Sequence, residues 1–215
     1  MDVLPIKKWR ALHSSETKGS VDMTHTTATQ VVTVDVEYEA FVARLAEEKD
    51  ERTISNSSKS HALSILRSVF RSAQEYVKIF SGSLSPDVYN DETLIHEMKK
   101  FVNDRKGNVQ VLIQNPADLQ PDVGNKFLVE LLALREAGRE VKINEALDQN
   151  HLKDAEMHFL VSDDRMYRIE VNIKKHTAVS SFNDAQRAAR LKGVFDDGNN
   201  EHANSYKPAL ELASA

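Results

Sequence analysis

The chain has 215 residues, of which 40% are hydrophobic and 28% charged, with a formal net charge of −5 and no cysteine. That length suits one domain with a substantial core plus tails, and the composition is typical of a globular chain rather than a disordered one. Without cysteine, disulfides, a thiol nucleophile and a cysteine-based zinc site are excluded.

Several further classes of protein are disfavoured. No apolar run approaches the ~20 residues that a membrane span requires, and the first residues lack the apolar stretch of a secretory signal, so we expect a cytoplasmic protein. The acidic net charge disfavours a dedicated nucleic-acid binder, whose affinity comes mainly from neutralising phosphates. The histidines lack the spacing of a metal site. The sequence also lacks the Gly-x-Ser-x-Gly motif of serine hydrolases and the Gly-x-x-x-x-Gly-Lys motif of nucleotide hydrolases. We therefore expect no metal and no cofactor.

The N-terminal part has no helical period. Residues 1–36 are rich in Thr, Ser and His, and we expect them to form an arm with a short strand at residues 30–36. Such an arm can be disordered alone and ordered on a partner.

Helices and strands then alternate. Apolar spacing of three and four predicts helices over residues 38–48, 60–76, 91–106 and 125–137, the second capped by Ser55, Ser57 or Ser58 and the third by Asp91. Apolar runs predict buried strands over residues 77–82, 108–114 and 141–143. This alternation indicates right-handed crossovers and a mostly parallel sheet covered by helices.

The pattern changes after Asn144. Residues 156–163 and 166–172 alternate apolar and polar side chains around Asp163-Asp164-Arg165, which predicts a hairpin. A further strand is predicted over residues 177–182, followed by a helix from 185 to about 194. We therefore expect one α/β domain over residues 37–200, a sandwich of a mostly parallel or mixed sheet flanked by helices, with residues 201–215 as a tail.

Two of these segments carry a resemblance. Met157 to Arg165, which contains His158, and Val179 to Asn183 resemble the motifs of the phospholipase D-like superfamily over roughly residues 52–200. Catalytic members carry His-x-Lys-x4-Asp, followed by a Gly-Ser-x-Asn segment that opens a helix. In that family one histidine attacks phosphorus, a second protonates the leaving oxygen, and lysines and asparagines bind the non-bridging oxygens. A chain with one motif resembles members that complete the site as homodimers.

Carried over residue by residue, the resemblance assigns His158 as the catalytic histidine and Ser181 and Asn183 as phosphate ligands. The lysine position is Leu160, and the acidic position is Arg165, which we also assign as a candidate phosphate ligand. Losing one preorganised donor typically lowers the rate by ~10²–10³, so the missing lysine argues against catalysis.

Simpler interpretations exist for each residue. His158 alone is typical of a hydrogen-bonded strand histidine, Asp163-Asp164 of a turn and Asn183-Asp184 of a helix cap. Arg168 and Glu170, which share one strand face, suggest an ion pair.

Two functions lead, and antitoxin-like inhibition, in which residues 1–36 wrap another protein, is a third possibility. The leading hypothesis is a non-catalytic phospholipase D-like protein that acts as a binding or structural subunit, an accessory protein of a bacterial defence or mobile-element system. It would form a homodimer or bind a protein partner through sheet edges and residues 1–36. The alternative is a divergent, homodimeric, metal-independent phosphodiesterase or nuclease that uses His158.

Overall fold

The computed structural model describes residues 35–115, 124–146, 157–173 and 177–198. The chain divides into two units, Met1–Val32 and Thr33–Ala215, and every described residue belongs to the second. The helices are α2 (Val36–Glu48), α3 (Lys59–Ser72), α4 (Pro86–Tyr89), α5 (Glu92–Asn103), α6 (Lys126–Glu136) and α7 (Ala185–Gly198). The strands are β1 (Ile54–Asn56), β2 (Tyr76–Ser81), β3 (Asn108–Ile113), β4 (Val141–Glu145), β5 (His158–Ser162), β6 (Met166–Asn172) and β7 (Thr177–Ser181).

The strands form one mixed sheet in the order β1-β7-β6-β5-β2-β3-β4. The pairs β2–β3 and β3–β4 are parallel, as the alternation of helices and strands predicts. The four other pairs are antiparallel, because β5 inserts beside β2 and β6 and β7 follow as a meander. The predicted α/β class is therefore confirmed, with the sheet in its mixed form.

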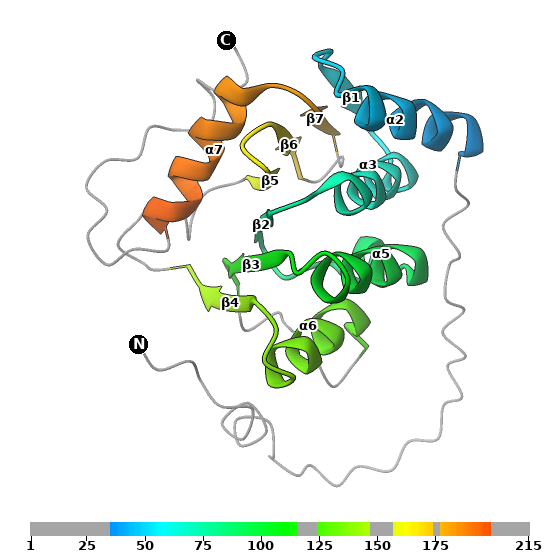
Figure 1. Cartoon of the computed structure of the whole chain (residues 1–215). Helices are drawn as coiled ribbons and strands as arrows, with labels where there is room; N and C mark the ends of the chain where they lie inside the picture. The colour runs from blue at the N-terminus through cyan, green and yellow to red at the C-terminus, as the bar shows by residue number, and fades with distance from the viewer. Residues whose placement is uncertain (1–34, 116–123, 147–156, 174–176, 199–215) are drawn as a thin grey trace, which may run out of the picture. The chain divides into compact units, whose positions relative to one another are not determined.

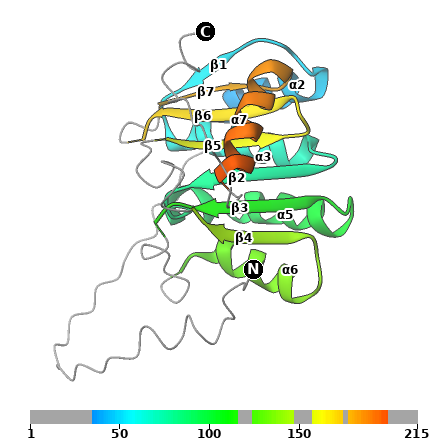
Figure 2. The ribbon, with the colours of Figure 1, turned by 90° about the vertical axis from the view of Figure 1, so that its left-hand side faces the viewer.

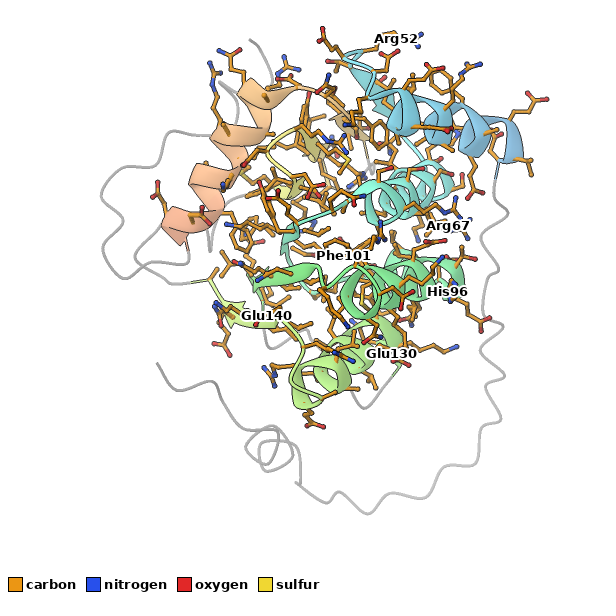
Figure 3. All side chains as sticks on the ribbon, in the orientation of Figure 1. Arg52, Arg67, His96, Phe101, Glu130 and Glu140 are labelled. Atoms are coloured by element: carbon orange, nitrogen blue, oxygen red, sulfur yellow. The ribbon has the colours of Figure 1, made fainter. Side chains whose placement is uncertain are left out.

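Helices cover both faces of the sheet (Figure 1). Helix α7 covers one face, where its Ala188, Leu191 and Phe195 join a hydrophobic cluster with Phe80 of β2 and Phe159 of β5. Figure 2 shows α7 in front of the strands, with α3 and α5 behind them. Helix α3 covers the face of the sheet opposite α7 and is buried along most of its length. Its Phe70 packs edge-on against Phe101 of α5, which is labelled in Figure 3, with ring centroids 6.1 Å apart.

Side-chain caps fix where the helices begin. Ser58 accepts a hydrogen bond from the backbone N–H of His61, so among the three serines considered it is Ser58 that caps α3. Asp91 caps α5 as predicted, through the N–H of Leu94 at 2.7 Å. The expected cap of α7 is Asp184, which accepts from the N–H of Arg187 at 3.0 Å.

The sequence prediction was wrong in places. Val36, the last residue of the predicted N-terminal strand, is the first residue of α2, because Asp35 accepts from the N–H of Tyr38 and caps a helix there. Residues 30–34 lie outside the described residues. Strand β1 and helix α4 were not predicted, since three and four residues are too few to show a period.

Candidate functional site

His158 lies at the start of β5, beside the end of β2. In the β2–β5 register Phe80 is opposite Phe159 and Ile79 is opposite Leu160. Because Phe159 belongs to the cluster under α7, the alternation of a strand directs His158 and Leu160 to the other face, which α2 and α3 cover.

A carboxylate fixes the orientation of the imidazole. Glu170 of β6 is directly opposite His158, and His158 Nδ1 lies 3.1 Å from Glu170 Oε2. The other carboxylate oxygen, Oε1, accepts a hydrogen bond of 2.9 Å from Nη2 of Arg168. The Arg168–Glu170 ion pair inferred from the sequence is present, but it is buried: the exposed fractions of the side chains are 8% for Arg168 and 11% for Glu170, against 24% for His158.

The partners of Glu170 decide its protonation. Burial raises the pKa of Glu170, but the hydrogen bond from His158 and the charge of Arg168 outweigh burial and hold that pKa below its ordinary value. Glu170 is therefore a buried carboxylate that both neighbours stabilise in its charged form.

Arg168 occupies the place across from the missing lysine. In the β5–β6 register it is opposite Leu160, which is only 2% exposed. Residues directly opposite on antiparallel strands share a face, so the guanidinium of Arg168 is on the same face as His158. Within the described residues, however, its guanidinium donates to Glu170. The cation that the sequence lacks at position 160 is thus present nearby but paired.

The imidazole also packs against Gly82, which follows β2. A Cβ added at Gly82 would lie 2.9 Å from His158 Nε2 and 3.7 Å from Nδ2 of Asn115, the second residue after β3. Glycine is therefore required for the observed position of the ring. His158 Nε2 and the amide of Asn115 approach the same point at the carboxyl ends of β2 and β3, where ligands of α/β proteins commonly bind. Asn115 was not singled out from the sequence, since no motif marks it.

The other three candidate residues gather at the opposite end of β5. Arg165 is in the β5–β6 turn, and its Nη1 donates to the carbonyl of Phe182 at 2.7 Å. Ser181 ends β7, and its Oγ accepts from the N–H of Asn183 at 3.3 Å. The turn follows Ser162, four residues beyond His158, or roughly 13 Å along the strand.

Strand β7 explains this separation. A strand that returned directly from the hairpin would bring the Ser-x-Asn segment back to His158, but β6 does this and β7 then reverses the chain once more. The structure brings Ser181, Asn183 and Arg165 together with one another and does not bring them to His158. Their role as phosphate ligands stays a prediction.

The acidic residues of the turn have structural partners. Asp163 and Asp164 have positive φ angles of 51° and 54°, as a tight hairpin requires. The carboxylate of Asp163 accepts from three successive backbone N–H groups, those of residues 74–76, at 2.7, 3.0 and 3.1 Å. Asp164 accepts from Lys192 at 2.9 Å. Asp163 therefore joins the hairpin to the start of β2.

Other kinds of site are not found in the described part of the chain. There, no three His, Asp or Glu side chains are grouped so as to hold a metal ion. None of the described helices is long and apolar enough to cross a membrane. A pocket of about 340 Å³ lies along α5, lined only by residues from Glu92 to Asp104, and is separate from His158.

Solved structures resemble this fold at low sequence identity. TrmBL2, an archaeal chromatin protein described as showing a novel mode of DNA binding, is 15% identical over 75% of this chain and 57% of its own, with a TM-score of 0.50. This chain thus spans little more than half the length of TrmBL2, and the similarity concerns the fold. NucT from Helicobacter pylori is 14% identical over 70% of this chain and 96% of its own, with a TM-score of 0.47. Phosphatidylserine synthase from Haemophilus influenzae Rd KW20 is 14% identical over 74% and 40%, with a TM-score of 0.43.

Sequence comparison gives a family. No curated protein matches the chain. One family model matches residues 58–202, which contain every described strand except β1 and all the residues around His158. The chain belongs to the family of that model, described as a domain of unknown function (DUF7931).

Proposed function

We propose that this protein is a non-catalytic phospholipase D-like protein that works by binding, as a structural or recognition subunit. The observation that carries the proposal is that neither of the two residues at the expected cation position offers a free positive charge to His158. Leu160 is buried where the lysine would stand, and the guanidinium across from it is bonded to Glu170. A phosphate at His158 would therefore meet no free preorganised cation from these residues, and such donors typically account for ~10²–10³ in rate each.

The other predicted ligands support the same conclusion. Arg165 donates to the carbonyl of Phe182, and Ser181 accepts from the backbone N–H of Asn183, at the end of β5 away from His158. The three residues are therefore not available to a phosphate at His158 of the same chain. A second copy placed with its His158 near the first would bring its own Leu160 and its own paired Arg168. A homodimeric site of the kind found in the family would therefore lack the lysine of both copies.

The partner that we propose is a second copy of the chain or another protein, bound through sheet edges and residues 1–36. The net charge of −5 favours a protein over a nucleic acid. A role as accessory protein of a bacterial defence or mobile-element system belongs to this proposal and rests on the phospholipase D-like resemblance alone.

One observation favours the enzymatic alternative. Nδ1 of His158 faces Glu170, an arrangement that fixes the tautomer and leaves Nε2 for chemistry, as in catalytic histidines. In a phosphodiesterase or nuclease, Nε2 would bond to phosphorus while the alkoxide leaves with a proton from the partner's histidine, and water would then hydrolyse the phosphohistidine. The Asn115 amide is near enough to Nε2 to help bind the phosphoryl oxygens.

Hydrolysis of phosphodiesters separates the two functions. The full chain is incubated in EDTA with bis(p-nitrophenyl) phosphate and with single-stranded DNA, beside His158→Ala and the matched control His96→Ala, whose histidine is exposed on α5. We expect all three proteins to give the buffer rate. Turnover that His158→Ala abolishes and His96→Ala retains would overturn the proposal in favour of the enzyme.

The mass in solution tests the binding part. Light scattering of the full chain and of a chain lacking residues 1–34, which keeps the Asp35 cap of α2, is expected to give a dimer that the deletion weakens. A full chain that is monomeric at all concentrations would contradict self-association and leave only a different protein as partner.

A further inference from the structure

Helix α6 is the last of the described helices at one end of the sheet. Figures 1 and 2 show α3, α5 and α6 in the same order as β2, β3 and β4, and β4 is the last strand at that end. The inner side of α6 packs on its own layer. Phe127 meets Phe70 of α3 edge-on, and Glu130, labelled in Figure 3, accepts from Lys99 of α5 at 2.7 Å.

The outer side of α6 carries four exposed residues in a row. Their spacings of three, four and three put them on one face of the helix. We call them the α6 stripe: Lys126, Val129, Ala133 and Glu136. Val129 is 46% exposed and is one of three exposed large hydrophobic side chains in the described part of the chain. The middle of the stripe is therefore apolar, and its two ends carry opposite charges.

The charges at the ends of the α6 stripe oppose the dipole of their own helix. Lys126 is the first residue of α6 and Glu136 the last, whereas the start of a helix favours an acidic side chain and its end a basic one. Lys126 lies 4.0 Å from Glu92, but these side chains are 63% and 91% exposed, and such a surface pair contributes little. Both charges would be better placed beside a second helix that runs in the opposite direction.

A second copy of α6 provides such a helix. When two copies lie antiparallel about a twofold axis level with Leu131, positions 126 and 136 are opposite each other, because each is five residues from 131. Positions 129 and 133 are likewise opposite, at two residues from 131. Lys126 then meets the partner's Glu136 and Val129 meets the partner's Ala133, and the axis repeats both contacts. The small side chain of Ala133 allows the two helices to approach closely.

We propose that the α6 stripe is a self-association surface, through which two copies of this chain pair α6 antiparallel to α6 at the β4 ends of their sheets. The inference rests on the self-association in the proposed function and names a surface for it. Helix α6 has 11 residues and is about 16 Å long. A contact of this length is small, so the dimer is reversible and depends on concentration.

This dimer would keep the two His158 residues apart. Strands β2 and β3 separate β5 from β4, so at ~4.8 Å per strand β5 is about 14 Å from the strand at the shared end. The pairing therefore differs from a homodimer that completes one site from two copies of His158, and it suits a protein that works by binding.

Sedimentation equilibrium of the full chain over a range of concentrations measures the dissociation constant of the dimer. Val129→Glu places a charge at the centre of the contact in both copies, so it should raise that constant at least ~10-fold. The matched control is Val171→Glu, because Val171 of β6 is equally exposed, at 45%, and lies outside the stripe. The control should leave the dissociation constant unchanged.

Charge reversal tests the antiparallel pairing. Lys126→Glu and Glu136→Lys each bring like charges together twice per dimer, so each variant alone should associate more weakly than the wild type. In a one-to-one mixture of the two variants, a mixed dimer regains both attractive pairs and should associate at least as tightly as the wild type. Both changes suit the helix dipole, so the Tm of each variant should not fall, which separates weaker association from unfolding.

The outcomes separate this surface from the rest of the proposed function. A dimer that none of the α6 variants weakens would overturn the surface and leave self-association through another one. A wild-type chain that stays monomeric would overturn the surface and self-association together. A mixture of Lys126→Glu and Glu136→Lys that associates no better than either alone would overturn the antiparallel pairing. Failure of the non-catalytic proposal is read separately, from the hydrolysis of phosphodiesters.

Discussion

Replacing Glu170 with glutamine tests the ionic network around His158. The substitution keeps the size of the side chain and removes its charge, so Arg168 loses its counter-charge at 2.9 Å and His158 Nδ1 loses its carboxylate at 3.1 Å. Both partners of the ion pair are about nine-tenths buried. Removing one member of a buried pair typically costs ~3–5 kcal/mol, because the other charge stays buried and unpaired. We expect a loss of about 3 kcal/mol, or a Tm lower by roughly 6–12 °C.

The pH dependence has a definite sign. The pKa of Glu170 in the folded chain is below its ordinary value of 4.5, so its charge stabilises the fold above that pH, and the contribution is lost as the pH falls from about 4.5 through the folded pKa. The difference in stability between wild type and Glu170→Gln should therefore be constant near neutral pH and should shrink below pH ~4.5.

Urea unfolding between pH 3.5 and 8 measures this difference. Glu145→Gln, which alters an exposed carboxylate on β4, is the matched control and should change stability by less than ~0.5 kcal/mol. Arg168→Met combined with Glu170→Gln should cost at least ~1 kcal/mol less than the sum of the single changes, because no charge is left unpaired. A loss below ~1 kcal/mol for Glu170→Gln, independent of pH, would refute the reasoning.

Three further substitutions test contacts around the two ends of β5. Gly82→Ala places a Cβ 2.9 Å from His158 Nε2, so it should destabilise the wild type by about 1–2 kcal/mol. In His158→Ala the same change should be neutral or stabilising. Equal effects in the two backgrounds, measured by urea unfolding, would contradict the packing of His158 against Gly82. Asp163→Asn tolerates the positive φ but loses one of the carboxylate oxygens that accept from the backbone N–H groups of residues 74–76, and should cost ~1 kcal/mol by the same measurement. No loss would mean that water replaces those bonds. The buried side chain of Lys78 is paired with the half-exposed Asp196. Asp196→Ala leaves the ammonium buried and unpaired, so it should lower the Tm more than Lys78→Met does. The reverse order would show that burial of the ammonium does not decide the loss of stability.

Much of the fold follows from local sequence signals. The helices α3, α5 and α6 and the strands β2, β3 and β4 carry long apolar periods or runs, so their positions match the prediction to within a few residues. The hairpin of β5 and β6 was predicted from alternation and from Asp163-Asp164, which adopt the backbone angles that aspartate tolerates.

The pairing of strands did not follow from such signals. That β5 lies antiparallel to β2, and not beside β4, depends on contacts between residues about 80 positions apart, which no local period encodes. The same limit affected the site. Arg165, Ser181 and Asn183 belong with His158 in the family motif, but Arg165 lies in the β5–β6 turn, and β7 brings Ser181 and Asn183 to that same turn, at the end of β5 away from His158.

The residues around His158 could be predicted in part from the sequence. Alternation on β6 put Arg168 and Glu170 on one face and suggested their ion pair, which the structure contains. That Glu170 is opposite His158, and that Arg168 is opposite Leu160, requires the register of the hairpin, and the turn length fixes that register. Asn115 comes from a third strand end and had no signal of its own.

Intact-mass spectrometry of the chain quenched with base during incubation with a phosphodiester tests most directly whether His158 is a nucleophile. A catalytic His158 would carry a covalent phosphoryl adduct, which base preserves and which His158→Ala would lack. Because Leu160 is apolar and Arg168 is paired with Glu170, neither residue offers a free cation to a phosphate at His158, and we predict the unmodified mass for the wild type at every time point. An adduct that maps to His158 would contradict a non-catalytic protein.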